Sequence, residues 1–255
     1  MSLTSIILRH AVPVPKIENF DRFLFIGPHP DDIEIGAGAT IAKLRRMGKE
    51  VTFLICMDGR YGLEHAPKGT TPEELTAIRK EETLAGAKVL GVSDVRFLDL
   101  CDGGFYDTDE LYQGILRVIG EVQPEILFAP DPSPLNECHI DHLNAGNAAK
   151  RAAFFAPFKE VMERYGARNA PVKAIAFYMT AKPNGFTDVR GYMEQQREAI
   201  LAHSSQFPND SESYRSLELY LKIRAIDFGV RSFKGQAEGF RVLGQTHMHC
   251  LPEEI

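Results

Sequence analysis

The chain has 255 residues, of which 44% are hydrophobic and 25% are charged, and 29 Lys and Arg against 35 Asp and Glu give a formal net charge of −6. This balance is typical of a folded globular protein and excludes a disordered chain. The negative charge argues against nucleic acids and anionic membranes as partners. No apolar run approaches the ~20 residues that a membrane span requires.

The four cysteines form no C-x-x-C pair. In a chain of this length they indicate reduced thiols, so we expect a cytoplasmic protein without a disulfide framework. We expect residues 1–255 to form a single domain, with residues 1–20 as an N-terminal extension of unknown role.

Short apolar runs alternate with helical patterns along most of the chain. In chain order the patterns predict a strand over 23–27, a helix over 36–47, a strand over 51–57, a helix from 72 to about 90, a strand over 95–100, a helix over 108–122, a strand over 125–129, a helix that ends near 155, a strand over 172–179, helices over 190–202 and 213–228, and a short strand over 237–243. This alternation predicts an α/β, Rossmann-like fold of three layers, in which a largely parallel sheet has helices on both faces.

Potential metal ligands are concentrated in two segments, each of which follows a predicted buried strand. The first is PHPDDIE over residues 28–34, and the second is CHIDH over residues 138–142. In the common doubly wound sheets the first and fourth strands are neighbours at the point where strand order reverses. We therefore expect the two segments to face one another across one crevice.

Together the two segments can supply a site of two histidines and one carboxylate. His29 and one aspartate would come from the first segment, and one histidine from the second. Such a set leaves coordination positions open for water and substrate, as a catalytic Zn²⁺ or Fe²⁺ site requires. A second carboxylate beside the metal and a histidine that protonates a leaving amine would complete the equipment for hydrolysis.

Each segment also has a purely structural interpretation, because aspartate and proline are common at helix N-termini. Two such segments at one edge of the sheet favour a functional site. By contrast, we expect Glu34 to cap the following helix and His203 to pack or hydrogen-bond inside the protein. His247 and His249 are expected in a surface tail, and loop 58–71 has the composition of a mobile flap over the site.

HPDDIEIGAGATIAKL (29–44) and HIDH (139–142) resemble the LmbE-like, or PIG-L-type, zinc-dependent N-acetylglucosaminyl deacetylases. The resemblance spans about residues 23–240, and DDIEIG is closest in motif to the bacillithiol-pathway members. Four further segments agree, namely RKEETLAGAKVLGV (79–92), LDLCDGGFY (98–106), AILAHSSQF (199–207) and AEGF (237–240).

The resemblance implies a cation held by the two segments. It implies His29, Asp32 and His142 as metal ligands and Asp31 as the general base. The implied cofactor is Zn²⁺, with Fe²⁺ or another divalent ion as the alternative.

Four further residues receive roles from the same resemblance. His139 would be the general acid and oxyanion stabiliser, tuned by Asp141. Arg79 would contact the substrate, and Asp102 would bind sugar hydroxyls.

The implied reaction removes an acetyl group from an N-acetylglucosamine-type sugar or glycoconjugate. An amidase that acts on another amide of a thiol-sugar conjugate is the first alternative, and a non-catalytic Rossmann-like binding protein is the second. The expected partner is the small amino-sugar substrate, and self-association into a homo-oligomer is left open.

Overall fold

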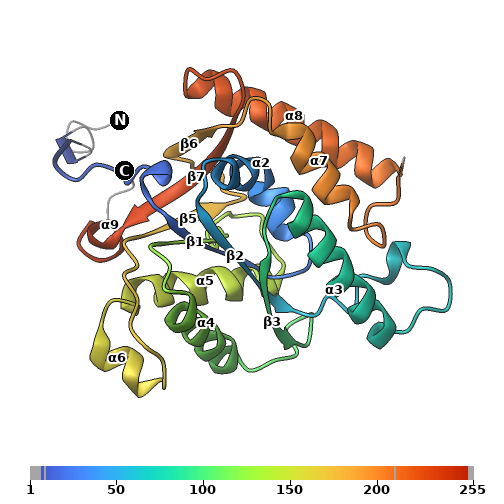
Figure 1. Cartoon of the computed structure of the whole chain (residues 1–255), viewed down its shortest axis with the longest axis horizontal. Coiled ribbons are helices and arrows are strands. Elements are labelled where there is room, and N and C mark those ends of the chain that lie inside the picture. Colours follow the sequence, from blue (N-terminus) through green and yellow to red (C-terminus); the bar gives the residue numbers. More distant parts are fainter. Residues whose placement is uncertain (1–6, 9, 210, 252–255) are drawn as a thin grey trace.

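In the computed structural model, which describes residues 7, 8, 10–209 and 211–251, seven strands form one sheet with helices on both faces (Figure 1). The strand order is β3-β2-β1-β4-β5-β7-β6. The first five of these are mutually parallel, whereas β7 is antiparallel to both β5 and β6. The strands are β1 (Arg22–Gly27), β2 (Glu50–Met57), β3 (Asp94–Leu100), β4 (Ile126–Pro130), β5 (Ala174–Tyr178), β6 (Gly185–Asp188) and β7 (Ala237–Gly244). The predicted α/β fold with a largely parallel sheet is confirmed.

The helices divide between the two faces of the sheet. They are α2 (Asp32–Arg46), α3 (Pro72–Val89), α4 (Thr108–Val122), α5 (Ile140–Phe155), α6 (Lys159–Arg164), α7 (Met193–Leu201), α8 (Glu212–Arg231) and α9 (Gln245–His249), with short 3-10 turns η1 (Ile17–Asn19) and η2 (Leu63–His65). One core cluster lies between the sheet and α4 and α5, and the other lies between the sheet and α2, α3 and α7. Helix α8 packs on β7 at the periphery (Figure 1).

The central strands are apolar on both sides because helices cover both sides. Along β1, Phe23 and Phe25 belong to the cluster under α2, while Leu24 and Ile26 belong to the cluster under α4 and α5. The ring of Phe25 stacks on that of Phe128 in β4 with centroids 4.2 Å apart. This packing joins β1 to β4, the two strands that carry the candidate metal ligands.

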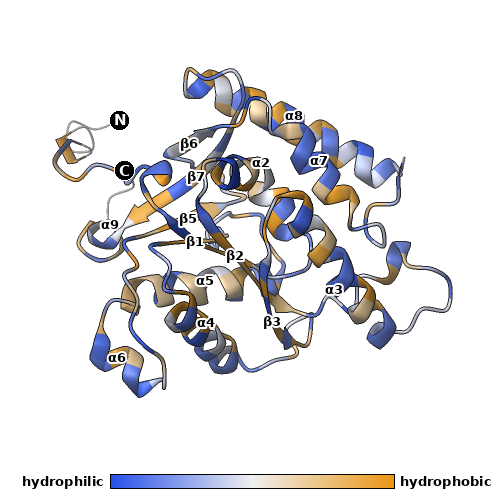
Figure 2. Ribbon diagram, in the orientation of Figure 1, coloured by the Kyte–Doolittle hydropathy of each residue, from blue (hydrophilic) through white to orange (hydrophobic). Residues whose placement is uncertain are grey.

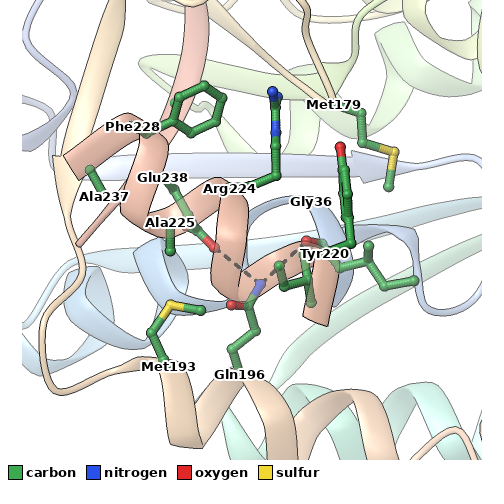
Figure 3. Close-up of a pocket in the computed structure, with 13 residues that line it drawn as sticks. Gly36, Met179, Met193, Gln196, Tyr220, Arg224, Ala225, Phe228, Ala237 and Glu238 are labelled. Atoms are coloured by element: carbon green, nitrogen blue, oxygen red, sulfur yellow. Dashed lines mark hydrogen bonds between the residues drawn. The ribbon is translucent and has the colours of Figure 1, made fainter. Parts of the chain in front are cut away.

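Two side chains, Glu238 and Gln196, tie α2 to its neighbours by binding backbone groups inside the helix, and Figure 3 shows their contact with each other. The carboxylate of Glu238 in β7 accepts hydrogen bonds from the backbone N–H of Ala39 (3.2 Å) and Thr40 (2.7 Å). The amide of Gln196 in α7 donates to the carbonyl oxygen of Glu34 (2.9 Å) and to Glu238 (3.1 Å). Because these bonds are made to backbone groups of α2, they fix the position of this helix against the sheet. We call Glu238 and Gln196 the α2 bracket.

Several elements differ from the sequence prediction. Helix α2 begins at Asp32, four residues earlier than expected, and α6, α9 and β6 were not predicted. His247 is 9% exposed and accepts the backbone N–H of Gly244, so the expected surface tail is wrong for this residue. In the N-terminal extension, Ile17 and Phe20 are buried in the core, while residues 1–6 and 9 lie outside the described residues. Among the described helices, none is long and apolar enough to cross a bilayer.

Candidate metal centre

The two ligand-rich segments meet at the carboxyl ends of β1 and β4. These strands pair directly and in parallel, so the turn after β1 and the loop before α5 lie side by side. The structure brings His29 and Asp32 from the first segment together with His142 from the second. The expected facing of the two segments across the strand-order reversal is therefore observed.

The three residues are spaced as ligands of one small cation. His29 Nδ1 lies 3.3 Å from Asp32 Oδ2, and His142 Nε2 lies 3.4 Å from Asp32 Oδ1. Ligand atoms at ~2.0–2.2 Å from a tetrahedral Zn²⁺ are separated by about 3.4 Å, which is the spacing seen here. Imidazole nitrogen and carboxylate oxygen are donors that suit zinc and iron. The residues thus fit a divalent ion.

The contacts of Nε2 in His29 show that Nδ1 is the ring nitrogen that is available to a metal. Its Nε2 lies 3.1 Å from an oxygen of Asp102 and 3.0 Å from an oxygen of Asp141. Carboxylates accept only, so Nε2 donates to Asp102 and Asp141, and Nδ1, which faces Asp32, is the nitrogen that can bind a metal once it has lost its proton. Burial opposes the protonated imidazolium, but these three carboxylates raise the pKa of His29 well above its ordinary value.

A second group of candidate ligands, His29, Asp102, His139 and Asp141, shares His29 with the first. The oxygens of Asp141 already accept the backbone N–H groups of Gly103 (2.8 Å) and Gly104 (2.9 Å). Burial alone would raise the pKa of Asp141, but the hydrogen bonds from His29 and from the glycine backbone hold it well below the ordinary value. Asp141 therefore acts as an anchor for His29, and the set with His142 is the better metal site.

Asp31 lies beside the ligand set in a strained backbone conformation. Its φ of 109° is in the region that side chains rarely adopt, which is typical of residues held for function. Arg79 Nη2 donates to Asp31 Oδ2 at 2.9 Å. Burial raises the pKa of Asp31 to about 6, against the opposing effect of Arg79. The carboxyl group is therefore fixed next to the position of the expected ion.

Arg79 is only 4% exposed, and its guanidinium is directed at the protein. Besides Asp31 it binds the backbone carbonyl oxygens of Gly59 (3.0 Å) and Pro30. These bonds join α3 to the turn after β1 and to the loop after β2. The role of substrate contact stays a prediction, while the observed contacts are those of a residue that positions Asp31.

His139 lies at the start of α5 and is the exposed histidine of the site. Its ring centroid is 4.7 Å from that of His29. Its Nδ1 accepts the backbone N–H of Asp141 at 3.4 Å, so in the neutral ring Nε2 carries the proton. Burial and the positive charges of His29 and His142 lower the pKa of His139, which favours this neutral form.

Part of this group lines a cleft of about 340 Å³, within the size range of small-molecule sites, whereas Asp32 and His142 are not among its lining residues. Asp31, Arg79, Asp102 and His139 lie in its wall, as does His29. Four lining residues were not predicted as site residues, namely Tyr61, Gly62, Gly103 and Gln206. Tyr61 and Gly62 belong to loop 58–71, the segment expected as a flap over the site, and they reach the cleft because β2 ends at the same sheet edge as β1.

Residues 202–207 (AHSSQF) bind the loop after β2 and helix α3, which both contribute to the cleft. Gln206 donates to the backbone carbonyl of Gly62 at 2.8 Å, and both serines bind the carboxylate of Glu82 in α3. His203 and Glu34 are fully buried, with His203 Nε2 3.3 Å from Glu34 Oε1. The prediction that Glu34 caps α2 is wrong, because its side chain faces His203 inside the protein. The buried packing expected for His203 is confirmed.

Comparison with known proteins gives a consistent assignment. The PIG-L family, described as GlcNAc-PI de-N-acetylase, matches residues 24–153. The diacetylchitobiose deacetylase of Thermococcus kodakarensis is 35% identical over 91% of this chain and 86% of its own length. The structure of N,N'-diacetylchitobiose deacetylase from Pyrococcus horikoshii is 30% identical, with a TM-score of 0.86 over 99% of this chain and 97% of that one.

A probable N-acetyl-alpha-D-glucosaminyl L-malate deacetylase of Bacillus anthracis is 27% identical over 75% of this chain and 84% of its own length. The expected closeness to the bacillithiol-pathway members thus has weaker support than likeness to the diacetylchitobiose deacetylases. Family motif, whole-chain likeness and the gathered His and Asp ligands agree. The chain belongs to the PIG-L family of deacetylases.

Proposed function

We propose that this protein is a metal-dependent deacetylase that hydrolyses the acetamide group of a small N-acetylglucosamine-containing sugar. The observation that carries the proposal is the gathering of His29, Asp32 and His142 around one cation-sized space beside Asp31. The relatives named above act on acetamido sugars, which supports the same class of substrate here. Diacetylchitobiose is the first compound to test, because the two diacetylchitobiose deacetylases named above match 91% and 99% of this chain.

Zn²⁺ is the ion that we expect His29, Asp32 and His142 to hold. When bound, it supplies Lewis-acid chemistry that polarises an amide carbonyl and lowers the pKa of water. The donor set of two imidazoles and one carboxylate also suits Fe²⁺, so the native metal is tested directly.

The side chains around the cleft can perform the proton transfers of amide hydrolysis. Asp31 takes the proton of the attacking water, whose oxygen bonds to the acetyl carbon. His139 donates its Nε2–H toward the carbonyl oxygen as negative charge develops there. The proton that Asp31 removed from the water then passes to the sugar nitrogen as the C–N bond breaks, and the products are acetate and the free amine. We expect Asp102, which lines the same cleft, to accept a hydrogen bond from a sugar hydroxyl in addition to its contacts with His29 and Tyr61.

The proposal is tested by acetate release from a panel of purified N-acetylated sugars. The panel contains diacetylchitobiose, N-acetylglucosamine, N-acetylglucosaminyl inositol and N-acetylglucosaminyl malate. Each compound is assayed with metal-stripped protein to which Zn²⁺ or Fe²⁺ has been added. We expect release that depends on the metal and stops with a chelator, together with about one bound metal per chain. His142→Ala should lose both metal and activity. A fully metal-loaded protein that releases no acetate from any of these compounds would overturn the proposal.

A further inference from the structure

Two aromatic side chains are exposed beside the cleft. Tyr61 lines the cleft and is 52% exposed, and Phe105, which follows the lining residue Gly103 in the loop after β3, is 72% exposed. Along the helices, hydrophobic and hydrophilic residues alternate, as expected where one side of a helix packs on the fold and the other faces solvent (Figure 2). Tyr61 and Phe105 belong to no helix or strand, so the packing of helices and sheet does not explain why two aromatic rings lie here.

The two rings contact one another at the edge of the cleft. Their centroids are 6.1 Å apart and their planes meet at 77°. A Cβ placed on Gly103 would lie 3.3 Å from Cε2 of Phe105 and 3.5 Å from Cδ2 of Tyr61, so both rings lie over this lining residue. Single exposed apolar residues are ordinary, but an aromatic pair at the edge of a cleft marks a binding surface. We call Tyr61 and Phe105 the aromatic corner.

The backbone on both sides of the aromatic corner is held in place. Gly103 and Gly104, whose φ values of 80° and 82° favour glycine, donate their backbone N–H groups to Asp141. The backbone N–H of Tyr61 donates to Oδ2 of Asp102 at 3.3 Å. Because these loops are already ordered, a ligand that packs on the two rings loses little free energy to ordering them.

The cleft and the aromatic corner differ in polarity. His29, Asp31 and Asp102 are among the residues that line the cleft, whereas the corner offers the faces and edges of two rings. A ligand that fits both has a polar group for the cleft and an apolar face for the corner. A pyranose ring has such a face, because its hydroxyl groups lie around its rim and its C–H groups lie above and below the ring. Tyrosine and phenylalanine bury such a face at a low cost in side-chain freedom.

The position of the aromatic corner determines which part of a substrate it contacts. In the reaction proposed above, the acetamide lies beside Asp31 and the ligand set, and the sugar that carries it occupies the cleft. A second ring linked to this sugar therefore lies toward the edge of the cleft, where the corner is.

We propose that the aromatic corner binds the second sugar ring of an N-acetylglucosamine disaccharide, and that the protein consequently prefers a disaccharide to the free monosaccharide. This inference rests on the function proposed above and adds to it two residues that determine specificity.

Steady-state kinetics of acetate release from diacetylchitobiose and from N-acetylglucosamine test the proposal. We expect Phe105→Ala to lower kcat/KM for the disaccharide about fivefold, mainly through KM, because an aromatic contact contributes a few-fold to about tenfold in binding. The value for the monosaccharide should stay unchanged. Phe105→Tyr keeps the ring and should keep the preference for the disaccharide.

Phe158→Ala is the matched control, since this phenylalanine is also exposed but lies beyond the other end of α5. The helix has 16 residues and therefore separates Phe158 from the cleft by roughly 24 Å. Both substrates should be released from acetate by this variant at wild-type values of kcat and KM.

Calorimetric titration tests the aromatic corner without turnover. Metal-loaded Asp31→Asn protein, in which we expect hydrolysis to be lost, is titrated with each sugar. The disaccharide should bind more tightly than the monosaccharide, and Phe105→Ala or Tyr61→Ala in the same background should remove most of the difference. This binding pattern in a protein whose wild-type form releases no acetate would overturn the deacetylase function and still support the aromatic corner.

Equal affinity for the disaccharide and the monosaccharide overturns the proposal, as does a Phe105→Ala variant that weakens both equally or neither, even if acetate is released. The octyl glycoside of N-acetylglucosamine tests a different occupant. If Phe105→Ala weakens its binding as strongly as that of the disaccharide, the corner recognises any apolar group attached to the first sugar, and the assignment to a second sugar ring is overturned.

Discussion

Asp31 combines a strained backbone, burial and a single charged partner, Arg79, beside the ligand set. Its neighbour Asp32 is the carboxylate that His29 and His142, the two proposed ligand histidines, approach. Two adjacent aspartates therefore occupy different environments, because the turn points their side chains in different directions. This separation of base and ligand is the basis of the first two predictions.

Asp31→Asn should keep the metal and lose most of its activity. The amide cannot accept the proton of water, and general-base catalysis contributes about 10²–10⁴-fold. Metal content by mass spectrometry and acetate release are measured on the same sample. Asp32→Asn is the contrasting variant and should lose metal as well as activity. Near-normal turnover in Asp31→Asn would show that another group is the base.

Arg79→Lys should lower kcat at least about tenfold and leave KM nearly unchanged. A lysine cannot hold Asp31 and two backbone carbonyls at once, so Asp31 would lose its fixed position. A residue that contacts the substrate would raise KM instead, and the two roles are thus distinguished by steady-state kinetics. Lys80→Met, next on the same helix and paired with Asp99 outside the cleft, is the matched control.

At the scale of elements, the sequence predicted the parts of the fold that depend on continuous apolar runs. Strands β1, β2, β4 and β5 were found because they are buried on both sides, and the half-buried edge strand β3 was found as well. Strand β6 was missed because GFTD is short, half-buried and at the edge of the sheet. The start of α2 was placed late because EIGAG suggests a turn, whereas glycine is needed there for close packing. A Cβ at Gly36 would overlap the ring of Tyr178.

The α2 bracket joins elements nearly 200 residues apart and is invisible in local sequence patterns. Burial raises the pKa of Glu238 to about 7, although hydrogen bonds from Thr40, Ala39 and Gln196 oppose the shift. The ordinary value is 4.5, so between pH 4.5 and about 7 the folded protein keeps a proton that the unfolded chain has lost. This group's contribution to stability therefore falls as pH rises through that window and is constant above it.

Glu238→Gln should lower the free energy of unfolding and remove this part of its pH dependence. Losing an acceptor for a buried backbone N–H costs about 1–3 kcal/mol. Urea denaturation at about pH 5 and pH 8 measures both effects. The difference between wild-type and variant should be larger at pH 5. Glu163→Gln, at an exposed position on α6, is the control and should leave the pH slope unchanged.

At the scale of the whole molecule, the strand-end rule predicted where chemistry gathers. It placed the segments after β1 and β4 at one edge, and the structure shows them in contact. The residue-to-residue network was not predictable in this way. The contacts of Asp102 and Asp141 with His29, the bonds of Arg79 and the buried His203–Glu34 pair all depend on side-chain packing between segments distant in sequence.

Metal removal should lower the melting temperature of the whole chain. The proposed ligands come from two segments that separate on unfolding, so an ion bound only to the folded state stabilises it. At a free metal concentration of 100 times Kd this stabilisation is about 2.7 kcal/mol. Scanning calorimetry with and without a chelator measures the shift, which His142→Ala should abolish. An unchanged melting temperature in a protein that demonstrably binds Zn²⁺ would contradict the shared site.

The loop between β4 and α5 is secured at its two ends and is exposed at Leu135 in its middle. Asp131 accepts the hydroxyl hydrogen of Thr180 at 2.5 Å, Asp141 is bound by two backbone N–H groups, and Leu135 between them is fully exposed. Residues 133–136 can therefore be exchanged for those of a relative, provided that Glu137 is kept, because its carboxylate accepts the backbone N–H of His139 (2.7 Å) and lies 3.3 Å from Nδ1 of His142. The influence of this loop on substrate preference can then be measured in a grafted protein in which the ion-binding framework is retained.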